Sequence, residues 1–376
     1  MKQVLGILGG GQLATMMCEA AARIEGVQTW VLSPDATAPA RHAATHFIRA
    51  DYTDIEALDR LRAHCDVVTV DNEHIPVTAL QHLEASLCVR PSSHTLATIQ
   101  DRLFQRRMLT HIDAPQTPHW AVADDETLAQ VERVAPFPAV LKSRRDGYDG
   151  YGQVVVRSAA ELDQAWIDIG RRPGVLEAFI DFQAEVSMLG ARTAGGETSF
   201  YPLVANEHVE GQLWRSCLPA TDFFELENAA RDIWLRIAEQ LDYVGLMAVE
   251  FFVDATGQLL VNEIAPRVHN SGHATQRSHA YSQFDLHVRA VLDHPLPDLG
   301  EVKATVMLNL FAEHHIDSEA LARDFEQAHG GRIVLYGKAP RPRRKTGHWL
   351  LATEQAQAAE AALRAARRHV ETSESA

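Results

Sequence analysis

Residues 261–273 read Val-Asn-Glu-Ile-Ala-Pro-Arg-Val-His-Asn-Ser-Gly-His and follow an apolar segment, Leu246–Val253, that contains one acid, Glu250. The residues that join the two segments, Asp-Ala-Thr-Gly at 254–257, are a turn signal, so the segments are predicted to form a β-hairpin. With a four-residue loop, Glu263 lies diagonally across from Glu250 on the same face of the hairpin. Such diagonal neighbours are roughly 7–8 Å apart between Cα atoms.

Burying an acid among these apolar residues costs free energy unless a positive charge meets it. Hard cations with oxygen ligands, Mg²⁺ above all, satisfy two carboxylates, usually with substrate phosphates completing the coordination shell. We therefore interpret Glu250 and Glu263 as candidate metal ligands. A structural ion pair with Arg267 is the alternative. A loop of three or five residues would weaken the metal interpretation, because it would put the two acids on opposite faces.

The composition indicates a folded protein of two or three domains, because the chain has 376 residues and a hydrophobic content of 46%. No apolar run approaches the roughly 18 residues that span a bilayer, and the N-terminus does not resemble a signal peptide. The four cysteines are scattered, which favours reduced thiols and no zinc site. The net charge of −15 disfavours nucleic-acid binding. We expect a cytoplasmic protein that binds neither membrane nor nucleic acid.

The order of strands and helices predicts an α/β part followed by an α+β part. Up to residue 98, strands such as Gln3–Leu8 alternate with helices such as Gln12–Glu25, which predicts a parallel sheet covered by helices. A helix is expected at Ile99–His111. Residues 99–295 then read as an α+β domain built around antiparallel strands, with one subdomain at about 115–177 and another at about 178–295.

Within that domain we predict a strand at Phe200–Val204 and a long helix at Leu226–Leu241. Prolines at 295 and 297 mark the start of a smaller C-terminal domain, residues 296–376. It is expected to end in an alanine-rich helix, Glu354–Arg368, and a disordered tail at 371–376.

A glycine-rich loop, Lys-Ser-Arg-Arg-Asp-Gly-Tyr-Asp-Gly-Tyr-Gly-Gln at 142–153, lies between two predicted strands. Its glycines free the backbone, so that successive N–H groups can turn toward an anion, and Lys142 adds a point charge for phosphate. The loop lacks the Gly-Lys-Ser/Thr of a Walker A motif. A plain hairpin loop is the alternative, but together with an acidic hairpin the loop favours ATP phosphates, over which it could close.

The glycines at the start of the chain, Gly-Gly-Gly-Gln-Leu-Ala at 9–14, match the dinucleotide-binding pattern, with Asp35 as a candidate ribose partner. The N-terminus of the helix that follows binds anions in general, so a sugar phosphate fits equally well. A tight strand-to-helix turn without a ligand is the other interpretation.

A basic segment, 338–348, carries Lys338, Arg341, Arg343, Arg344 and Lys345 and contains no acid. Its prolines and glycine favour a shaped loop, and we interpret it as a site for a phosphate monoester rather than a solvated surface run.

Taken together, these segments resemble the ATP-grasp ligases, and they are most similar to the 5-(carboxyamino)imidazole ribonucleotide synthases of bacterial purine biosynthesis. The resemblance covers nearly the whole chain. The matching motifs are Gly-Gly-Gly-Gln-Leu (9–13), Gln-Asp-Arg (100–102), Gly-Tyr-Asp-Gly (147–150), Glu-Val-Ser (185–187), Tyr-Pro (201–202) with Asn206 and His208, the 262–273 block, and Lys338 with Arg-Lys-Thr-Gly-His (344–348).

The resemblance implies an ATP-grasp fold between an N-terminal Rossmann-like domain and a small C-terminal domain. It implies that ATP, bicarbonate and 5-aminoimidazole ribonucleotide give the N-carboxyamino ribonucleotide, ADP and phosphate through carboxyphosphate, on the route to IMP. Mg²⁺, with Mn²⁺ as a substitute, would be bound by Glu250 and Glu263. Relatives are typically homodimers, so a homodimer is expected.

The resemblance also implies the roles of individual residues. Those that contact ATP would be Arg102, Lys142, Gly147, Tyr148, Asp149, Gly150, Tyr151, Gly152, Gln153, Glu177, Ala178, Phe179, Ile180, Glu185, His208, Asn262 and Glu263. Those that contact the ribonucleotide would be Gly11, Gln12, Leu13, Glu73, Arg267, Asn270, Ser271, Lys338, Arg344 and Lys345. The catalytic residues would be Tyr148, Asp149, Arg267 and His273, with His273 or Asp149 as the base for the amine.

Some positions depart from the family pattern. Tyr151 stands where the family usually has Lys or Arg, and Arg144 or Arg145 could compensate. Asp71 and His74 stand where relatives often have Glu and Asn. Asn262 should face away from Glu263 by strand alternation, unless a bulge or strand end intervenes.

Three other functions are compatible with parts of the sequence. A sister ATP-grasp enzyme, such as the formate-dependent glycinamide ribonucleotide transformylase, would share the nucleotide site. A nicotinamide-dependent oxidoreductase would explain residues 9–14 but neither the glycine loop nor the acidic hairpin. A non-catalytic nucleotide sensor would explain Tyr151.

Overall fold

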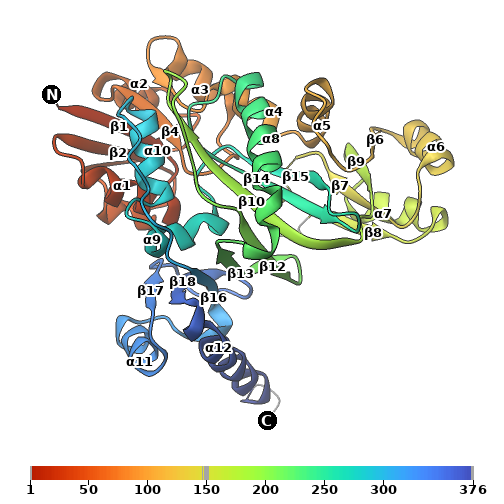
Figure 1. Ribbon diagram of the computed structural model, residues 1–376. Helices are drawn as coiled ribbons and strands as arrows, with labels where there is room; N and C mark the ends of the chain where they lie inside the picture. The colour runs from red at the N-terminus through yellow and green to blue at the C-terminus, as the bar shows by residue number, and fades with distance from the viewer. Residues whose placement is uncertain (1, 146, 148–151, 374–376) are drawn as a thin grey trace.

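The structure, a computed structural model, describes residues 2–145, 147 and 152–373 (Figure 1). Its N-terminal part is a five-stranded parallel sheet in the order β3-β2-β1-β4-β5, as predicted. The bounds are β1 Gln3–Leu8, β2 Val27–Ser33, β3 His46–Arg49, β4 Val67–Val70 and β5 Cys88–Val89; the helices are α1 Gln12–Ala22, η1 Pro39–His42, α2 Ile55–His64, α3 Val77–Glu84 and α4 Ser93–Ile99. The strands carry the apolar runs that such doubly covered sheets require.

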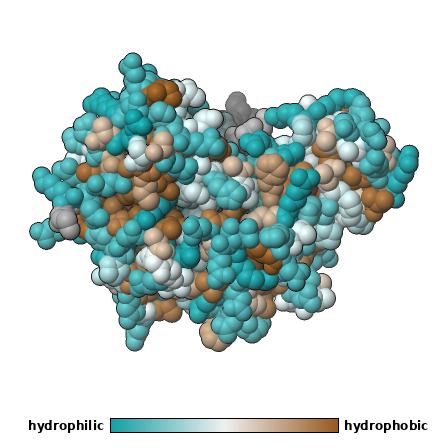
Figure 2. Space-filling model, turned by 90° about the horizontal axis from the view of Figure 1, so that it is seen from above, coloured by the Kyte–Doolittle hydropathy of each residue, from teal (hydrophilic) through white to brown (hydrophobic). Residues whose placement is uncertain are grey.

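A four-stranded antiparallel sheet in the order β6-β9-β7-β8 forms the next unit, after helix α5, Arg102–His111. Its elements are β6 His119–Val122, α6 Asp125–Val134, β7 Ala139–Ser143, β8 Gln153–Val156, η2 Ala159–Glu161, α7 Leu162–Asp168 and β9 Gly174–Ala178. In Figure 2 a hollow separates the lobe with this sheet, at the right, from the body of the molecule.

The largest sheet runs in the order β15-β14-β10-β12-β13-β16-β18-β17, with β11 beside β10. Its strands are β10 Phe182–Arg192, β11 Thr198–Phe200, β12 Val204–Val209, β13 Gln212–Leu218, β14 Gly245–Asp254, β15 Leu259–Ala265, β16 Thr305–Phe311, β17 Arg332–Leu335 and β18 Lys345–Ala352. Because β13 pairs with β16, the strands of the C-terminal segment extend the sheet of the preceding segment.

The remaining helices pack on this sheet or at its ends. They are η3 Thr221–Leu226, α8 Glu227–Gln240, η4 Asn270–Ala274, α9 Thr275–Ser278, α10 Gln283–Val291, η5 Ala312–His314, α11 Glu319–His329 and α12 Thr353–Ser373. Of the helices in the described part of the chain, none combines the length and the apolar character that a bilayer span requires.

Several predicted elements were wrong in their bounds; helix α1, for example, ends at Ala22 rather than at Glu25. The strand expected at Phe200–Val204 is the end of β11 and the start of β12, separated around Pro202, which has no N–H to donate to a ladder. The helix expected at Ile99–His111 is broken, because Asp101 caps a new helix by accepting from the N–H groups of Leu103 and Phe104. Helix α12 continues to Ser373, past the predicted start of the tail.

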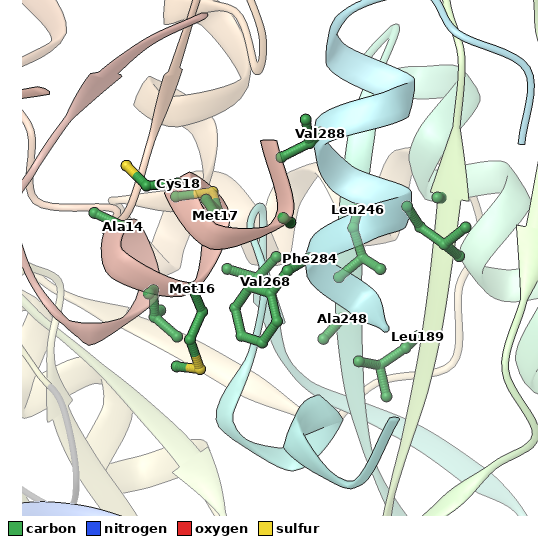
Figure 3. Packing of buried hydrophobic residues seen from close by; sticks show 14 of the residues in the cluster. Ala14, Met16, Met17, Cys18, Leu189, Leu246, Ala248, Val268, Phe284 and Val288 are labelled. Carbon is green, nitrogen blue, oxygen red and sulfur yellow. The ribbon is translucent and has the colours of Figure 1, made fainter. Parts of the chain in front are cut away.

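Helix α1 joins the N-terminal sheet to the large sheet. Met16 and Met17 of α1 face Phe284 and Val288 of α10, and α10 covers Leu246 of β14 (Figure 3). This packing fixes the turn before α1 relative to the segment after β15, and so positions one side of the site described below.

Buried His287 of α10 adds a polar link across the same interface. Its Nδ1 accepts from the Leu246 N–H at 3.0 Å, so its Nε2–H donates to Thr69 Oγ1 at 2.8 Å. Burial lowers the pKa of His287 to about 4, which keeps the imidazole neutral at pH 7.

We predict that the destabilisation caused by His287→Gln depends on pH. The folded state holds neutral His287, so its contribution is complete above the unfolded pKa of 6.5 and is lost as pH falls toward 4. The difference in unfolding free energy between wild type and variant should therefore shrink by about 1.4 kcal/mol per pH unit below 6.5. Urea denaturation between pH 7.5 and 4.5 measures it, with exposed His94→Gln as the control. A constant difference would contradict this role.

Candidate active site

The hairpin of β14 and β15 brings Glu250 and Glu263 opposite each other, but by a different register from the predicted one. Val253 pairs with Leu259 rather than Gln258, so the loop is longer than four residues. By itself this would put the two acids on opposite faces. A bulge between Glu250 and Phe251 shifts the register by one residue. Glu250 therefore pairs with Glu263, and Asn262 is the extra residue of β15. Of the possibilities considered for Asn262, the structure shows the bulge.

The surroundings of Glu250 disfavour its charge. The pKa of this carboxyl is raised to about 7, mainly by burial and also by the charges of Glu263 and Glu185, while His208 and Lys345 act in the opposite direction. His269 Nε2 lies 3.7 Å from Glu250 Oε1, but burial lowers the pKa of His269 to about 3, so this imidazole is neutral at pH 7. The two acids thus face one another in a place that disfavours the charged form of Glu250.

Arg267, the alternative partner for these acids, is bound elsewhere. Its Nε and NH2 donate to the two oxygens of Glu73, the NH2 bond at 2.9 Å, and its NH1 donates to the Val268 carbonyl at 3.0 Å. Burial alone would raise the pKa of Glu73, but Arg267 outweighs it and lowers the value to about 2. Arg267 thus neutralises Glu73, and the donor set of Glu250 and Glu263 fits a hard cation.

Within residues 2–145, 147 and 152–373, no group of three or more His, Cys, Asp or Glu side chains is arranged to hold a metal ion. At a nucleotide site, Mg²⁺ is expected to bind two carboxylates, while phosphate and water complete its coordination shell.

Lys142, at the end of β7, is buried and donates to Glu177 of β9, with Nζ 2.6 Å from Oε2. The other oxygen, Oε1, accepts from Arg106 Nε at 2.9 Å. Burial would raise the pKa of Glu177, but Arg106 and Lys142 outweigh it and hold the pKa well below its usual value. Arg102 belongs to the same cluster. Burial is the main cause that lowers the pKa of Lys142, and the charge of Arg102 lowers it as well.

Arg106 is a site residue that the sequence analysis missed. A signal was present, because Arg102 and Arg106 are four residues apart on α5 and so lie on one face of that helix.

The glycine loop is described only at its ends, and Tyr148, Asp149, Gly150 and Tyr151 lie outside the described residues. Gly152 has φ +73°, and a Cβ there would lie 2.6 Å from Ser143 Oγ, so only glycine fits. Gln153 pairs with Lys142 as the first residue of β8, and Gly147 lies beside Gly152.

The two arginines considered as substitutes for a cation at position 151 are engaged elsewhere. Arg144 NH2 donates to Asp101 Oδ2 at 2.6 Å, and Arg145 Nε donates to the same oxygen at 3.3 Å. They connect the start of the glycine loop to the N-terminus of α5.

Four of the residues predicted to contact ATP, Glu177, Ala178, Phe179 and Ile180, run from β9 to β10, and Phe179 is exposed. Glu185 of β10 and His208 of β12 lie side by side, with His208 Nδ1 2.7 Å from Glu185 Oε2. Burial would lower the pKa of His208, but the bond to Glu185 and the charge of Glu250 raise it.

A cavity of about 390 Å³ lies between the N-terminal sheet and Arg267. Asp71, at the end of β4, forms part of its floor and accepts from the Gly11 N–H at 2.7 Å. Gln12 Oε1, at the start of α1, accepts from Lys338 Nζ. The lining residues are Gly10, Gly11, Gln12, Leu13, Ser33, Pro34, Asp35, Ala38, Tyr52, Asp71, Asn72 and Arg267.

Of the predicted ribonucleotide residues, Gly11, Gln12, Leu13 and Arg267 line this cavity. Glu73, Arg267 and Lys338 are close to it through the contacts above, and burial together with Arg344 lowers the pKa of Lys338 to about 8. The charge of Lys345 acts on Lys338 and also on Glu250 and His208, so Lys345 lies between the cavity and the acidic hairpin.

Three residues of the 262–273 block contact other polar side chains and do not line the cavity. Asn270 exchanges two amide hydrogen bonds with Asn309, at 3.0 and 2.9 Å, and Ser271 Oγ lies 2.9 Å from His269 Nδ1. His273 is completely buried; its Nδ1 is 3.0 Å from Gln283 Nε2, and its Nε2 has no hydrogen-bond partner among the described residues. Burial keeps the pKa of His273 well below 6.5, and the structure does not bring its imidazole to the cavity surface.

A smaller antiparallel sheet that carries Lys142, joined through Arg106 to a larger sheet with two opposed acids, defines an ATP-grasp protein. Residues 107–284 match the ATP-grasp domain, residues 1–100 the ribonucleotide synthetase preATP-grasp domain, and residues 305–362 the phosphoribosylaminoimidazole carboxylase C-terminal domain.

The chain is 39% identical to N5-carboxyaminoimidazole ribonucleotide synthase of Pseudomonas aeruginosa, over 95% of this chain and 98% of that protein. The chain belongs to the N5-carboxyaminoimidazole ribonucleotide synthase family.

Two solved structures of this kind match the fold. The Staphylococcus aureus synthetase complexed with ADP has a TM-score of 0.90 at 32% identity, covering 96% of this chain and 98% of that one. The Aspergillus clavatus synthase in complex with ADP and 5-aminoimidazole ribonucleotide has a TM-score of 0.88 at 28% identity and covers 99% of both chains. The family leaves the oxidoreductase and the formate-dependent transformylase without support.

Proposed function

We propose that this chain carboxylates 5-aminoimidazole ribonucleotide with bicarbonate and ATP, giving the N5-carboxyamino ribonucleotide, ADP and phosphate in de novo purine biosynthesis. The observation that carries the proposal is the continuity of one segment, residues 263–267. Glu263 meets Glu250 at its start, and Arg267 lines the cavity at its end. A phosphoryl donor and an acceptor bound at these two places would be neighbours. The activity named for the relatives supports the assignment.

On the nucleotide side, the phosphates would lie against Lys142 and Arg102, with residues 147–153 covering them. The backbone of 177–180 would hold the adenine, and Glu185 with His208 the ribose. Glu250 and Glu263, with Asn262 beside them, would hold Mg²⁺ or Mn²⁺, which neutralises charge on the phosphates when bound. Phosphoryl transfer depends mainly on positioning and charge neutralisation, and these residues provide both.

On the acceptor side, Arg267 with Glu73, Asn270 and Ser271 would bind the aminoimidazole ribonucleotide. Gly11, Gln12, Leu13, Lys338, Arg344 and Lys345 would bind its ribose phosphate. Amide N–H groups at the start of α1 and the cations opposite them suit an anion.

The bonds change in two steps. A bicarbonate oxygen attacks the γ-phosphorus, and the bond to ADP breaks to give carboxyphosphate. The exocyclic amine then attacks the carboxyl carbon, phosphate leaves with the bonding electrons, and the amine loses a proton. Carboxyphosphate is unstable in water, so closure of the site is required. We assign Tyr148 and Asp149 to this closed state, and we leave His273 out of the proton transfer because it is buried.

We further propose that the protein is a cytoplasmic homodimer. This part rests on the resemblance to the family and on the place of the reaction in purine synthesis.

The purified protein should release phosphate from ATP in the presence of Mg²⁺ only when 5-aminoimidazole ribonucleotide and bicarbonate are both added. A coupled assay of phosphate release measures this, with formate replacing bicarbonate as the control. Phosphate release that is indifferent to the ribonucleotide would overturn the assignment, and stimulation by formate and glycinamide ribonucleotide would indicate the sister enzyme.

The variant Glu263→Gln should lower turnover by about 100-fold or more, because the cation loses a charged ligand while the side chain keeps its size. Its thermal midpoint should stay close to that of wild type, since Glu263 is only partly buried. Glu239→Gln, at an exposed position of α8, is the matched control. Turnover like that of wild type would refute the metal assignment.

A further inference from the structure

Arg106 is completely buried and uses its guanidinium in two directions. Toward β9 it donates to Glu177 Oε1, from Nε at 2.9 Å, with NH2 2.8 Å from the same oxygen. Toward β15 its NH1 donates to the Val261 carbonyl at 2.7 Å, and its NH2 donates to the Asn262 carbonyl at 2.9 Å. One side chain therefore contacts both sheets that form the nucleotide site.

The contact of Arg106 with Glu177 fixes the position of Lys142, the lysine assigned to the phosphates. Arg106 holds one oxygen of Glu177, and Lys142 Nζ donates to the other at 2.6 Å. A carboxylate held at one oxygen by a rigid guanidinium has little freedom to rotate, so the second oxygen fixes where the ammonium lies. The position of Lys142 thus depends on Arg106 through Glu177.

The contacts of Arg106 with β15 fix the position of Glu263, the carboxylate assigned to the metal. The carbonyls that Arg106 contacts are those of Val261 and of Asn262, the extra residue of the bulge. A bulge disrupts the ladder locally, and buried carbonyls there need other donors. Without the bulge, Glu263 would face away from Glu250, because side chains alternate along a strand.

We propose that Arg106 is a positioning residue that places Lys142 and Glu263 relative to each other, through Glu177 and through the carbonyls of Val261 and Asn262. This inference rests on the proposed function, because it takes Lys142 as a phosphate ligand and Glu263 as a metal ligand. It goes beyond that function by naming the side chain that positions the phosphate lysine and the metal carboxylate relative to each other.

The geometry distinguishes this role from that of a simple ion pair. Neutralising Glu177 needs one cation, and Lys142 already supplies one. The two bonds to backbone carbonyls, both shorter than 3.0 Å, add nothing to that charge balance. They require the planar fork of arginine, which a lysine ammonium cannot reproduce.

Three variants separate the two directions. Arg106→Lys keeps a cation for Glu177 but loses the fork; Glu177→Gln weakens the tie to Lys142 and leaves the carbonyl bonds available; Arg106→Gln weakens both. Arg236→Gln is the matched control, because Arg236 also donates to two backbone carbonyls, those of Ile112 and Asp113, at 3.0 and 3.1 Å. Circular dichroism and thermal midpoints establish which variants fold.

The readout is binding of the non-hydrolysable analogue AMP-PNP by titration calorimetry, without metal and across a series of Mg²⁺ concentrations. We expect Arg106→Lys to raise the Mg²⁺ concentration at half-saturation by about tenfold and to change metal-free AMP-PNP affinity by less than about threefold. Glu177→Gln should do the reverse. Arg106→Gln should impair both by about tenfold or more, and Arg236→Gln neither.

Folded Arg106→Gln protein with both affinities within about twofold of wild type would overturn the inference, because the loss of a positioning group must appear in binding. If Arg106→Gln does not fold, an equal response of both affinities to Arg106→Lys would overturn it. These measurements need neither bicarbonate nor the ribonucleotide. If wild type shows no ribonucleotide-stimulated phosphate release, the proposed function is rejected, but the AMP-PNP and Mg²⁺ binding results can still be interpreted.

Discussion

The site depends on a bulge in one strand of a hairpin. Strict pairing from the β14–β15 loop would turn Glu263 away from Glu250, and the extra residue Asn262 reverses this. Two carboxylates then share one face in a largely buried place, which raises the pKa of Glu250 to about 7. Such an arrangement is costly in free energy without a cation. A bound cation removes the repulsion between the carboxylates, which favours cation binding.

Every other part of the site is arranged around that face. Arg106 holds the bulge and, through Glu177, the lysine of the smaller sheet. The chain leaves β15 and within two residues reaches Arg267, which is neutralised by Glu73 of the N-terminal domain. Packing of α1 on α10 brings the Gly11 turn to the same cavity (Figure 3). Local pairing and interdomain packing thus bring nucleotide and acceptor residues together.

Much of this could be predicted from the sequence, because the patterns involved are local. Alternation of apolar strands with helices predicted the parallel N-terminal sheet, and the turn residues between Val253 and Gln258 predicted the hairpin. The register was wrong, since loop length is set by local backbone bonds such as those to Asp254, which the composition of the turn does not determine. The bulge itself was recognised only as a requirement at Asn262.

What the sequence could not provide are contacts between distant residues. Glu177 was expected only to contact ATP, but its carboxylate also lies between Arg106 and Lys142, which are 71 and 35 positions away. His273 was one of two candidate bases from the resemblance to the family, yet tertiary packing buries it against Phe284 and His348. Burial and partner choice of polar groups follow from the three-dimensional arrangement, which no single segment encodes.

The central claim is that the bulge creates a metal site from Glu250 and Glu263. Crystals grown with AMP-PNP and Mn²⁺ test it directly, because manganese scatters X-rays anomalously and can be located by itself. We expect an anomalous peak between these two carboxylates, in contact with the phosphates and absent in Glu263→Gln. A peak elsewhere, or a wild-type site with nucleotide but no metal at the two carboxylates, would contradict it.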